Sequence, residues 1–199
     1  MSEPTRCSWA GPQPIYIAYH DEEWGVPRAD DRLLLEKLTL EGFQAGLSWI
    51  TILNKRARFR EVFDNFDAEK VARYDAKKIE SLLADAKIIR HRGKIEAAIS
   101  NAKVYLEMRG KISLSAFLWD FVDGAPIQNQ VKRMEDIPAQ TDVSKAMAKA
   151  LKLKGFRFCG PTTVYAFMQS VGMVNDHLVD CHRFEPCVEL ARSFTAPQE

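Results

Sequence analysis

The stretch K-L-K-G-F-R-F-C-G-P-T-T, residues 152–163, lies between two helix-forming segments and decides the fold. Gly155 stands where a left-handed residue would end the first helix. Gly160 lets the backbone turn closely, and Pro161 suits the first position of the next helix. The stretch therefore predicts two helices joined by a short hairpin, with the start of the second helix facing outward.

The start of that second helix is a predicted anion site. Its first backbone N–H groups lack helical partners, and the helix dipole places partial positive charge there. Lys152, Lys154 and Arg157 are close by in the sequence, so the expected anion is a nucleic-acid phosphate. The segment resembles a helix-hairpin-helix DNA-binding element. The alternative is an ordinary helical hairpin punctuated by glycine and proline.

Helical periodicity extends through most of the chain, and we find no convincing alternating strand. Asp30 or Asp31 is expected to cap a leucine-rich helix, which Gly42 and Gly46 should interrupt. Further helices are expected at residues 47–53, 68–74, 76–84, 90–108, 117–121, 142–154 and 161–171, with caps at Asp67, Asp75, Ser113 or Ser115, and Thr141 or Asp142. The pattern predicts an all-α fold.

We expect one domain over residues 1–187, followed by a flexible C-terminal tail at residues 188–199. Residues 123–140 lack periodicity and contain glycine and two prolines, which indicates a connecting loop within the domain. A chain of 199 residues can bury a substantial core without disulfide bonds.

The composition indicates a globular protein of a reducing compartment. Hydrophobic residues make up 46% of the chain and charged residues 28%. Four cysteines are too few and too scattered for a disulfide framework. We recognise neither a signal peptide nor an apolar run long enough to span a bilayer. We therefore expect a cytoplasmic protein that makes no membrane contact. We also expect it to be a monomer.

The formal net charge of +1 does not by itself indicate a nucleic-acid partner. Basic residues nevertheless gather in three segments, at residues 55–60, 87–94 and 149–157. Such segments are most often solvated helix faces. If all three lay on one side of the fold, they would form an electrostatic footprint for phosphates.

Two cysteines and two histidines form a candidate metal site that would join the ends of the chain. Cys7 and His20 lie early in the sequence, whereas His177 and Cys181 lie late. The late pair is spaced i, i+4, so on a helix both side chains would share a face. Two thiolates and two imidazoles suit tetrahedral Zn²⁺, and four protein ligands leave no open position, as in a structural site. The alternative is unrelated buried cysteines and surface histidines.

Aromatic residues gather around an acid in residues 15–27 and 40–50. The set comprises Tyr16, Tyr19, Trp24, Glu41, Gln44 and Trp49, with Trp9 just upstream. Aromatic residues usually belong to a core, but a buried carboxylate in an apolar stretch needs a partner. Aromatic faces stack on a planar base, while a carboxylate and a tyrosine hydroxyl read its edge. The set therefore predicts a base-binding pocket.

Over residues 7–181 the sequence resembles the bacterial 3-methyladenine DNA glycosylase I family, known as TAG. The resemblance is carried by five stretches: Y-I-A-Y-H-D-E-E-W-G-V-P (residues 16–27), L-E-G-F-Q-A-G-L-S-W-I-T-I-L (40–53), I-I-R-H-R-G-K-I (88–95), K-G-F-R-F-C-G (154–160) and V-N-D-H-L-V-D-C (174–181). The second stretch is the most specific. The resemblance implies an all-α helix-hairpin-helix fold. It also implies an enzyme of base excision repair that releases 3-methyladenine from alkylated double-stranded DNA.

The resemblance also implies roles for individual residues. The structural zinc ligands of the family correspond to Cys7, His20, His177 and Cys181. The carboxylate and tyrosine set against the excised base correspond to Glu41 and Tyr19. The stacking tryptophan corresponds to Trp49, and the residues lining or supporting the pocket correspond to Trp9, Tyr16 and Trp24.

The DNA-contacting parts of the family can be assigned in the same way. The wedge and the loop that contacts the gap left by the flipped nucleotide correspond to Gln44, Gly46 and Leu47. The phosphate anchor corresponds to the hairpin and includes Lys154, Gly155, Gly160, Thr162 and Thr163.

The implied chemistry has one notable departure. Many helix-hairpin-helix glycosylases carry a catalytic aspartate after the hairpin, but this region holds Tyr165 and Ala166. An N3-methylated adenine is cationic in the nucleoside and leaves as a neutral base, so it needs less activation. We expect water to attack the sugar carbon, and we assign no definite base to that water. No lysine is clearly placed for Schiff-base chemistry, which predicts a monofunctional enzyme.

Two other functions remain open. A non-catalytic, zinc-stabilised DNA-binding module would need the basic hairpin but not the aromatic pocket. An enzyme acting on free nucleobases or nucleosides would need the pocket but not the hairpin.

Overall fold

The computed structural model describes residues 3–197 and is predominantly helical. The helical elements are η1 (Ser8–Ala10), α1 (Pro14–Glu22), α2 (Asp31–Gln44), α3 (Trp49–Val62), η2 (Asp64–Phe66), α4 (Ala68–Val71), α5 (Ala76–Ala84), α6 (Arg92–Met108), α7 (Leu114–Trp119), η3 (Asp120–Val122), η4 (Met134–Asp136), α8 (Asp142–Lys154), α9 (Pro161–Ser170) and α10 (Phe184–Ser193). The predicted helical fold class is confirmed.

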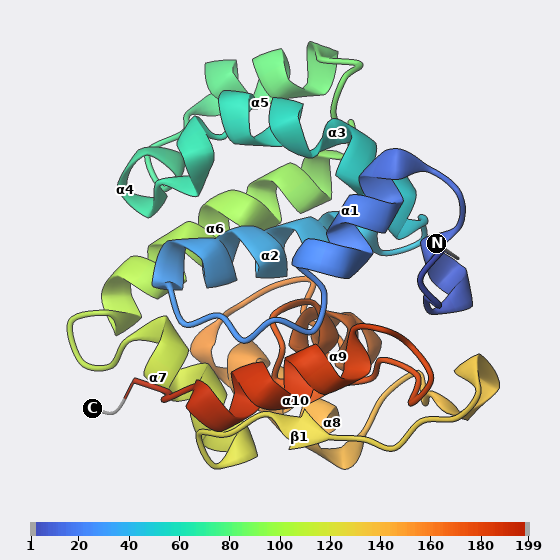
Figure 1. Ribbon diagram of the computed structural model, residues 1–199. Coiled ribbons are helices and arrows are strands. Elements are labelled where there is room, and N and C mark those ends of the chain that lie inside the picture. The colour runs from blue at the N-terminus through green and yellow to red at the C-terminus, as the bar shows by residue number, and fades with distance from the viewer. Residues whose placement is uncertain (1–2, 198–199) are drawn as a thin grey trace.

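Helix α2 runs through the middle of the molecule, with α3 to α6 on one side and α7 to α10 on the other (Figure 1). It packs against α3, α6, α7 and α9. Every residue from Leu34 to Phe43 is buried, as expected for a helix that is covered all round.

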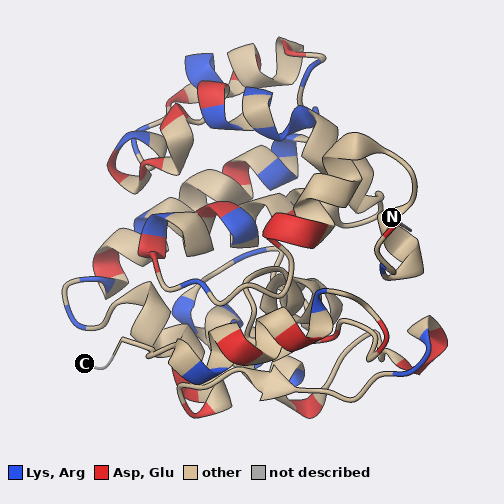
Figure 2. Cartoon of the chain, in the orientation of Figure 1, with Lys and Arg blue, Asp and Glu red and all other residues tan. Residues whose placement is uncertain are grey.

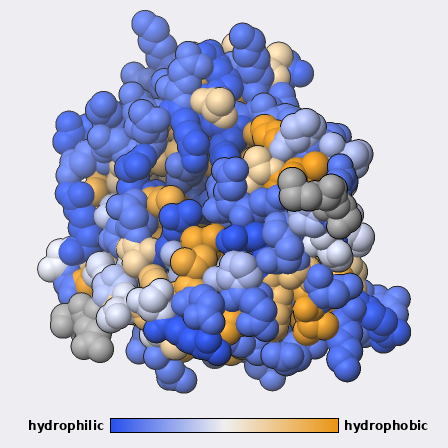
Figure 3. All heavy atoms as spheres, viewed as in Figure 1, coloured by the Kyte–Doolittle hydropathy of each residue, from blue (hydrophilic) through white to orange (hydrophobic). Residues whose placement is uncertain are grey.

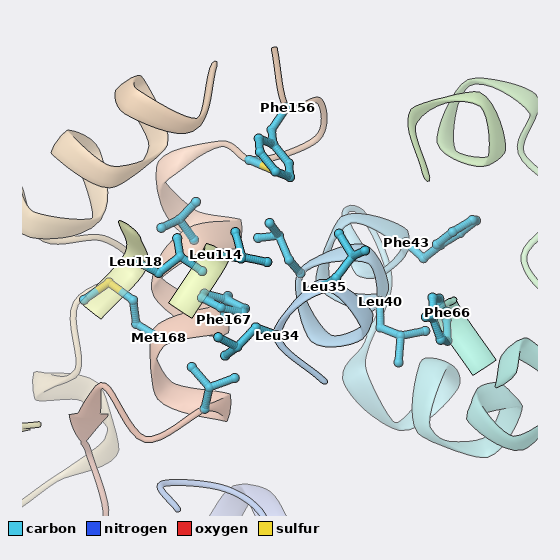
Figure 4. Packing of buried hydrophobic residues seen from close by; sticks show 14 of the residues in the cluster. Leu34, Leu35, Leu40, Phe43, Phe66, Leu114, Leu118, Phe156, Phe167 and Met168 are labelled. Atoms are coloured by element: carbon cyan, nitrogen blue, oxygen red, sulfur yellow. The ribbon is translucent and has the colours of Figure 1, made fainter. Parts of the chain in front are cut away.

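The core lies on both sides of α2 (Figure 4). Leu34 points towards Phe167 of α9, whereas Leu40 and Phe43 face the side that holds Phe66. Burying a large apolar side chain contributes about 1.5–3 kcal/mol. The centre of the fold is therefore fixed by the leucine-rich helix that also carries Glu41.

Several predicted helix caps are present. Asp30 Oδ1 accepts a hydrogen bond from the Leu33 N–H at 2.8 Å and begins α2. The same kind of bond begins α4, α5, α7 and α8, from Asp67, Asp75, Ser113 and Thr141. Each cap satisfies backbone N–H groups that have no helical partner.

The structure corrects the expected role of Gly42. This glycine does not interrupt α2, which continues to Gln44. A Cβ atom at position 42 would lie 3.3 Å from Phe158 Cβ, so the missing side chain allows the hairpin loop to approach the helix. Gly46 does lie beyond the helix, with a φ of +82° that disfavours other residues.

A short parallel pair of strands was not predicted. Strand β1 (Ile127–Gln128) pairs with β2 (Val174–Asn175), within the segment expected to be a loop and just after α9. Each strand has only two residues, too few for an alternating pattern to appear in the sequence.

The expected flexible tail differs from the structure at residues 188–193. These residues form the second half of α10, which packs against β2. Beyond the helix, the Phe194 ring lies 4.3 Å from the Trp119 ring, centroid to centroid. Residues 198 and 199 of the expected tail lie outside the described residues.

The face seen in Figure 3 is mainly hydrophilic, and its apolar residues form small groups. Within residues 3–197, no helix combines the length and the apolar character needed to cross a membrane.

Candidate functional site

The predicted aromatic residues meet in one pocket where α1, α2 and α3 converge. The Tyr19 and Trp49 rings lie 5.3 Å apart, and the Trp9 ring lies 4.9 Å from Trp24 and 5.1 Å from Tyr16. The pocket has a volume of about 310 Å³ and is lined by Trp9, Tyr16, Tyr19, Trp24, Glu41, Gln44, Trp49, Met134, Ile137, Ala166 and Gln169. Every aromatic residue predicted for the pocket lines it.

Three side chains of this pocket carry buried polar groups. The side chains of Glu41, Tyr19 and Trp49 belong to residues only 4%, 3% and 7% exposed. The Trp49 Nε1 atom is buried without a hydrogen-bond partner among residues 3–197. No hydrogen bond to a described residue contributes to the shifted pKa of Glu41 or Tyr19. Buried polar groups are nearly always paired, so this arrangement is typical of a site that awaits a polar ligand.

The acid of the pocket is electrostatically unusual. Desolvation raises the pKa of Glu41 to about 8, although the nearby positive charge of Lys37 acts in the opposite direction. Glu41 therefore exchanges its proton near neutral pH, which is typical of functional carboxyl groups.

Lys37 is a buried cation that the sequence did not single out. Its Nζ lies 4.7 Å from the Tyr19 ring centroid and 5.5 Å from that of Trp49, and it donates to Glu23 Oε2 at 3.3 Å. Arg56 makes a bidentate hydrogen bond to the same carboxylate, with both distances at 2.6 Å, so Glu23 pairs with both Lys37 and Arg56. The signal in the sequence was the spacing of Lys37 and Glu41, four residues apart on an apolar helix.

The four predicted metal ligands also come together. Cys7, His20, His177 and Cys181 are all buried, and their donor atoms lie within 4.8 Å of one another. The Cys181 Sγ is 3.5 Å from both His20 Nε2 and His177 Nδ1, and the Cys7 Sγ is 3.6 Å from His177 Nδ1. The cluster joins the two ends of the chain and could hold a metal ion.

The outer nitrogen atoms of the two histidines are bonded to acceptors. His20 Nδ1 donates to Asp21 Oδ1 at 2.7 Å, and His177 Nε2 donates to the Trp24 carbonyl at 3.1 Å. In each ring the other nitrogen then directs its lone pair into the cluster, as a metal ligand requires. The donor set and its surroundings therefore fit a metal ion.

His177 and Cys181 do not lie on a helix, although their spacing would suit one. The two residues lie in the turn between β2 and α10, where the Cys181 N–H bonds to the Leu178 carbonyl at 2.8 Å. The i, i+4 spacing brings them together because this turn folds the chain back as tightly as a helix would.

The pocket and the cluster share a wall. The Trp24 ring lies 4.6 Å from the His177 ring, and the Trp9 ring lies 5.2 Å from the His20 ring. Trp9 and Trp24 both line the pocket on their other sides. A metal ion bound by the cluster would therefore also hold Trp9 and Trp24 in place at the edge of the pocket.

The loop after α2 presents an apolar side chain beside the pocket. Gln44 lines the pocket, and its carbonyl accepts the Leu47 N–H at 2.6 Å. Gly46 makes this turn with positive φ, and the Leu47 side chain that follows it is 43% exposed.

The hairpin has the predicted geometry. Gly155 ends α8 with a φ of +102°, and Pro161 begins α9. The first intrahelical bond runs from the Val164 N–H to the Gly160 carbonyl, so the N–H groups of Thr162 and Thr163 precede the helical ladder. One turn further on, Ala166 lines the pocket, so α9 links the hairpin to the pocket.

The three basic segments differ in how their charges are used. In the first segment, Arg56, Arg58 and Arg60 pair with carboxylates, and in the second, Arg92 pairs with Glu80. In the third, Lys149, Lys152, Lys154 and Arg157 are exposed, and within residues 3–197 they form no ion pair. Figure 2 shows both signs of charge interspersed, so the three segments do not form one basic face of the molecule. The hairpin is the segment whose exposed basic residues adjoin the start of α9.

One polar residue that lines the pocket and its buried partner were also missed. Gln169 lines the pocket, and its Nε2 donates to Asp176 Oδ2 at 2.7 Å. Asp176 is 1% exposed and also accepts bonds from the Tyr165 hydroxyl and from Asn129. A buried acid therefore contacts Tyr165, although the residues directly after the hairpin include no aspartate.

A helical domain with an aromatic pocket, a buried acid in that pocket and a basic hairpin belongs to the class of proteins that could hold a flat, polar-edged ligand and an anion. Comparison with known proteins identifies one family: residues 9–184 match the family model for methyladenine glycosylase. The chain belongs to the methyladenine glycosylase family.

Individual relatives agree with this assignment. The chain is 52% identical over 185 residues to a DNA-3-methyladenine glycosylase of Haemophilus influenzae, covering 92% of this chain and 97% of that protein. A crystal structure of 3-methyladenine DNA glycosylase I (TAG) superposes with a TM-score of 0.88 at 50% identity, covering 89% of this chain and 98% of that one. A TAG structure from Staphylococcus aureus, solved for the structural basis of 3-methyladenine recognition, gives a TM-score of 0.87 at 38% identity over 90% and 96% of the two chains.

Proposed function

We propose that this protein is a DNA-3-methyladenine glycosylase that acts in base excision repair. It flips the methylated nucleotide out of alkylated double-stranded DNA and hydrolyses its N-glycosidic bond. The observation that carries the proposal is the pocket, which brings the desolvated side chains of Glu41 and Tyr19 together with the aromatic ring of Trp49. The relatives named for this reaction support the same conclusion.

In this proposal the base stacks on Trp49, while Glu41 and the Tyr19 hydroxyl bond to its polar edge. Trp9, Tyr16 and Trp24 form the remaining aromatic wall. The methylated base carries positive charge before cleavage, so ionised Glu41 attracts the lesion more strongly than normal adenine. The pocket thereby selects for charge as well as for shape.

The chemical step needs little help at the leaving group. The bond between the base and the sugar carbon breaks, its electron pair neutralises the methylated base, and water adds to the sugar carbon and loses a proton to solvent. Stabilising the departing base and the cationic sugar is the contribution of the protein. We propose no lyase step, because Lys37 is tied to Glu23 and does not line the pocket.

Contact with DNA is assigned to two segments. The exposed Leu47, with Gln44 and Gly46, would fill the space left by the flipped nucleotide, as apolar wedges do in bent DNA. The hairpin would hold a phosphate through the backbone N–H groups at Thr162 and Thr163, beside Lys154, Gly155 and Gly160. In this proposal the hairpin, with α8 and α9, acts as a helix-hairpin-helix anchor.

The metal is proposed to be a structural Zn²⁺ held by Cys7, His20, His177 and Cys181. Tetrahedral zinc with ordinary bond lengths needs sulfur and nitrogen ligands about 3.6 Å apart. The sulfur–nitrogen separations of 3.5, 3.5 and 3.6 Å in the cluster match this value. Four protein ligands leave no position for substrate, so the ion would stabilise the fold and take no part in the reaction.

One assay separates this function from its alternatives. The protein is incubated with methylated duplex DNA, and released 3-methyladenine is measured beside the Glu41→Gln variant. A non-catalytic DNA-binding module would bind the duplex and release nothing. An enzyme of free nucleosides would cleave methylated nucleoside in preference to DNA. We also propose that the protein acts as a monomer in the cytoplasm, which sedimentation and cell fractionation would test.

A further inference from the structure

The stretch I-I-R-H-R-G-K-I, residues 88–95, has no role in the site described so far. It crosses into the start of α6, where His91 Nδ1 accepts the Lys94 N–H at 3.2 Å and caps the helix. Its basic residues were expected to face solvent or phosphate. Lys94 instead is 8% exposed.

The Lys94 ammonium lies at the C-terminal end of α2. Its Nζ donates to the Phe43 carbonyl at 2.9 Å and to the Ala45 carbonyl at 2.6 Å. The last carbonyls of a helix have no helical partner, and a cation there also complements the helix dipole. One side chain therefore ends α2 and fixes the direction in which the chain leaves it.

The two carbonyls flank Gln44, which lines the pocket, and they directly precede Gly46 and Leu47. Without Lys94, this turn would be held mainly by the short bond from the Leu47 N–H to the Gln44 carbonyl. The position of the exposed leucine relative to the pocket thus depends on α6.

A second polar residue on the same helix holds the hairpin. Asn101 Oδ1 accepts the Arg157 N–H at 2.8 Å, and Asn101 Nδ2 donates to the Arg157 carbonyl at 3.0 Å. Asn101 is 4% exposed, so its side-chain amide is largely shielded from solvent. Lys94 and Asn101 are seven residues apart, which places them on one face of α6.

The two held segments also touch each other between these anchors. Phe158 packs over Gly42, where an added Cβ would lie 3.3 Å from Phe158 Cβ. Phe158 keeps a φ of +56°, which is uncommon for a bulky residue, so this loop conformation is held by its surroundings. Figure 1 shows α6 running alongside α2 in the middle of the molecule.

We infer that Lys94 and Asn101 are positioning residues. From one face of α6 they fix the position of the Gln44–Leu47 turn relative to the hairpin, so that both segments can contact duplex DNA around one lesion. The inference rests on the proposed function, because it takes these two segments as the DNA contacts. Neither residue contacts the base, so their loss should affect duplex processing more than binding of the free base.

The test compares Lys94→Met, Asn101→Leu and wild type, with Lys103→Met as a control because Lys103 is an exposed lysine on the same helix. Two quantities are measured: kcat/KM for release of 3-methyladenine from methylated duplex, and the Kd of free 3-methyladenine from quenching of tryptophan fluorescence. We expect at least a tenfold loss of kcat/KM in both variants, and a Kd within twofold of wild type. The control should match wild type in both.

A parallel loss of duplex release and free-base binding would overturn the inference, because it would mean that the pocket itself had collapsed. Unchanged duplex release would overturn it as well. If Lys94→Met does not fold, Lys94→Gln keeps one donor for the two carbonyls, and an intermediate loss is expected. If wild type releases no base, the proposed function fails, and with it the premise that these segments serve excision. If wild type releases the base and the variants release it equally well, only the proposed role of α6 is refuted.

Discussion

Lys37 and Glu41 lie one turn apart on α2 and are both buried, with 3% and 4% of their surface exposed. The lysine is directed towards Glu23, which also carries Arg56, while the carboxyl group of Glu41 belongs to the pocket. Charge of both signs is thus buried beside one aromatic stack. The balance between desolvation and Lys37 sets the pKa of Glu41 at about 8.

Excision should depend on the ionisation of Glu41. Below pH 8 the carboxyl group holds a proton for much of the time, so kcat/KM should rise by about tenfold per pH unit and level off above about pH 8. Glu41→Gln should reduce release by at least about tenfold near pH 8 and remove this rise. Initial rates on methylated duplex from pH 5.5 to 9 would check both. A variant that retained the wild-type pH profile would show that another group titrates.

The same carboxyl group should lower the stability of the protein as pH rises. Its pKa is raised from 4.5 in the unfolded chain to about 8 in the folded state. Between these values the folded state binds a proton that the unfolded state has released, so the free energy of unfolding falls across this window. The effect should be complete above about pH 8.

Glu41→Gln cannot ionise, so the variant should gain stability over wild type between pH 5 and 8.5, on the order of 1–3 kcal/mol. Urea unfolding at both pH values, with metal present throughout, would measure the difference. A difference between variant and wild type that stays constant with pH would show that Glu41 has an ordinary pKa. The expected gain accompanies loss of activity, because the same burial creates both.

Most of the fold follows from local signals in the sequence. The caps at Asp30, Asp67 and Asp75 and the glycine that ends α8 each act within a few residues, so the helix ends near them could be predicted. The two-residue strands depend on a contact between distant segments, so no local pattern indicated them.

The residues that form the site could be predicted from the sequence, but the residues that hold them in place could not. The aromatic set and the four metal ligands were all expected, because each lies in a distinctive stretch. The support from Lys37, Lys94 and Asp176 was not, since each acts through a partner far away in the sequence or through burial. Burial on all sides of α2 decides the charge state of the pocket, and it can be known only once the helices are packed.

The bonds around the metal ligands should control metal affinity. Asp21 accepts from His20 Nδ1 at 2.7 Å and also from the Arg6 guanidinium at 2.8 Å, so it holds the imidazole in place. Asp21→Asn should weaken zinc binding by about tenfold or more, as loss of such a partner commonly does. Competition with a chromophoric chelator would measure the affinity. Asp120→Asn removes an exposed carboxylate elsewhere and should bind zinc like wild type.

Removing the metal should loosen the pocket as well as the fold. Trp9 and Trp24 lie between the cluster and the pocket, so a chelator should lower the thermal midpoint and weaken binding of free 3-methyladenine together. Both should return when zinc is added back. Chelation that left base binding unchanged would mean that the aromatic wall stands without the cluster.

The exposed leucine offers a test of how the protein opens the duplex. Leu47 is 43% exposed and follows the turn at Gly46, so its side chain is available to fill a gap in stacked DNA. Leu47→Ala removes most of the apolar surface that would replace the flipped base, and release from duplex should fall by about tenfold, equivalent to about 1.4 kcal/mol. Zinc content and the Kd of free 3-methyladenine should stay as in wild type, because Leu47 lines neither site. Leu190→Ala is a matched control, since Leu190 is 39% exposed on α10. Equal activity of the two variants on methylated duplex would exclude Leu47 as a wedge.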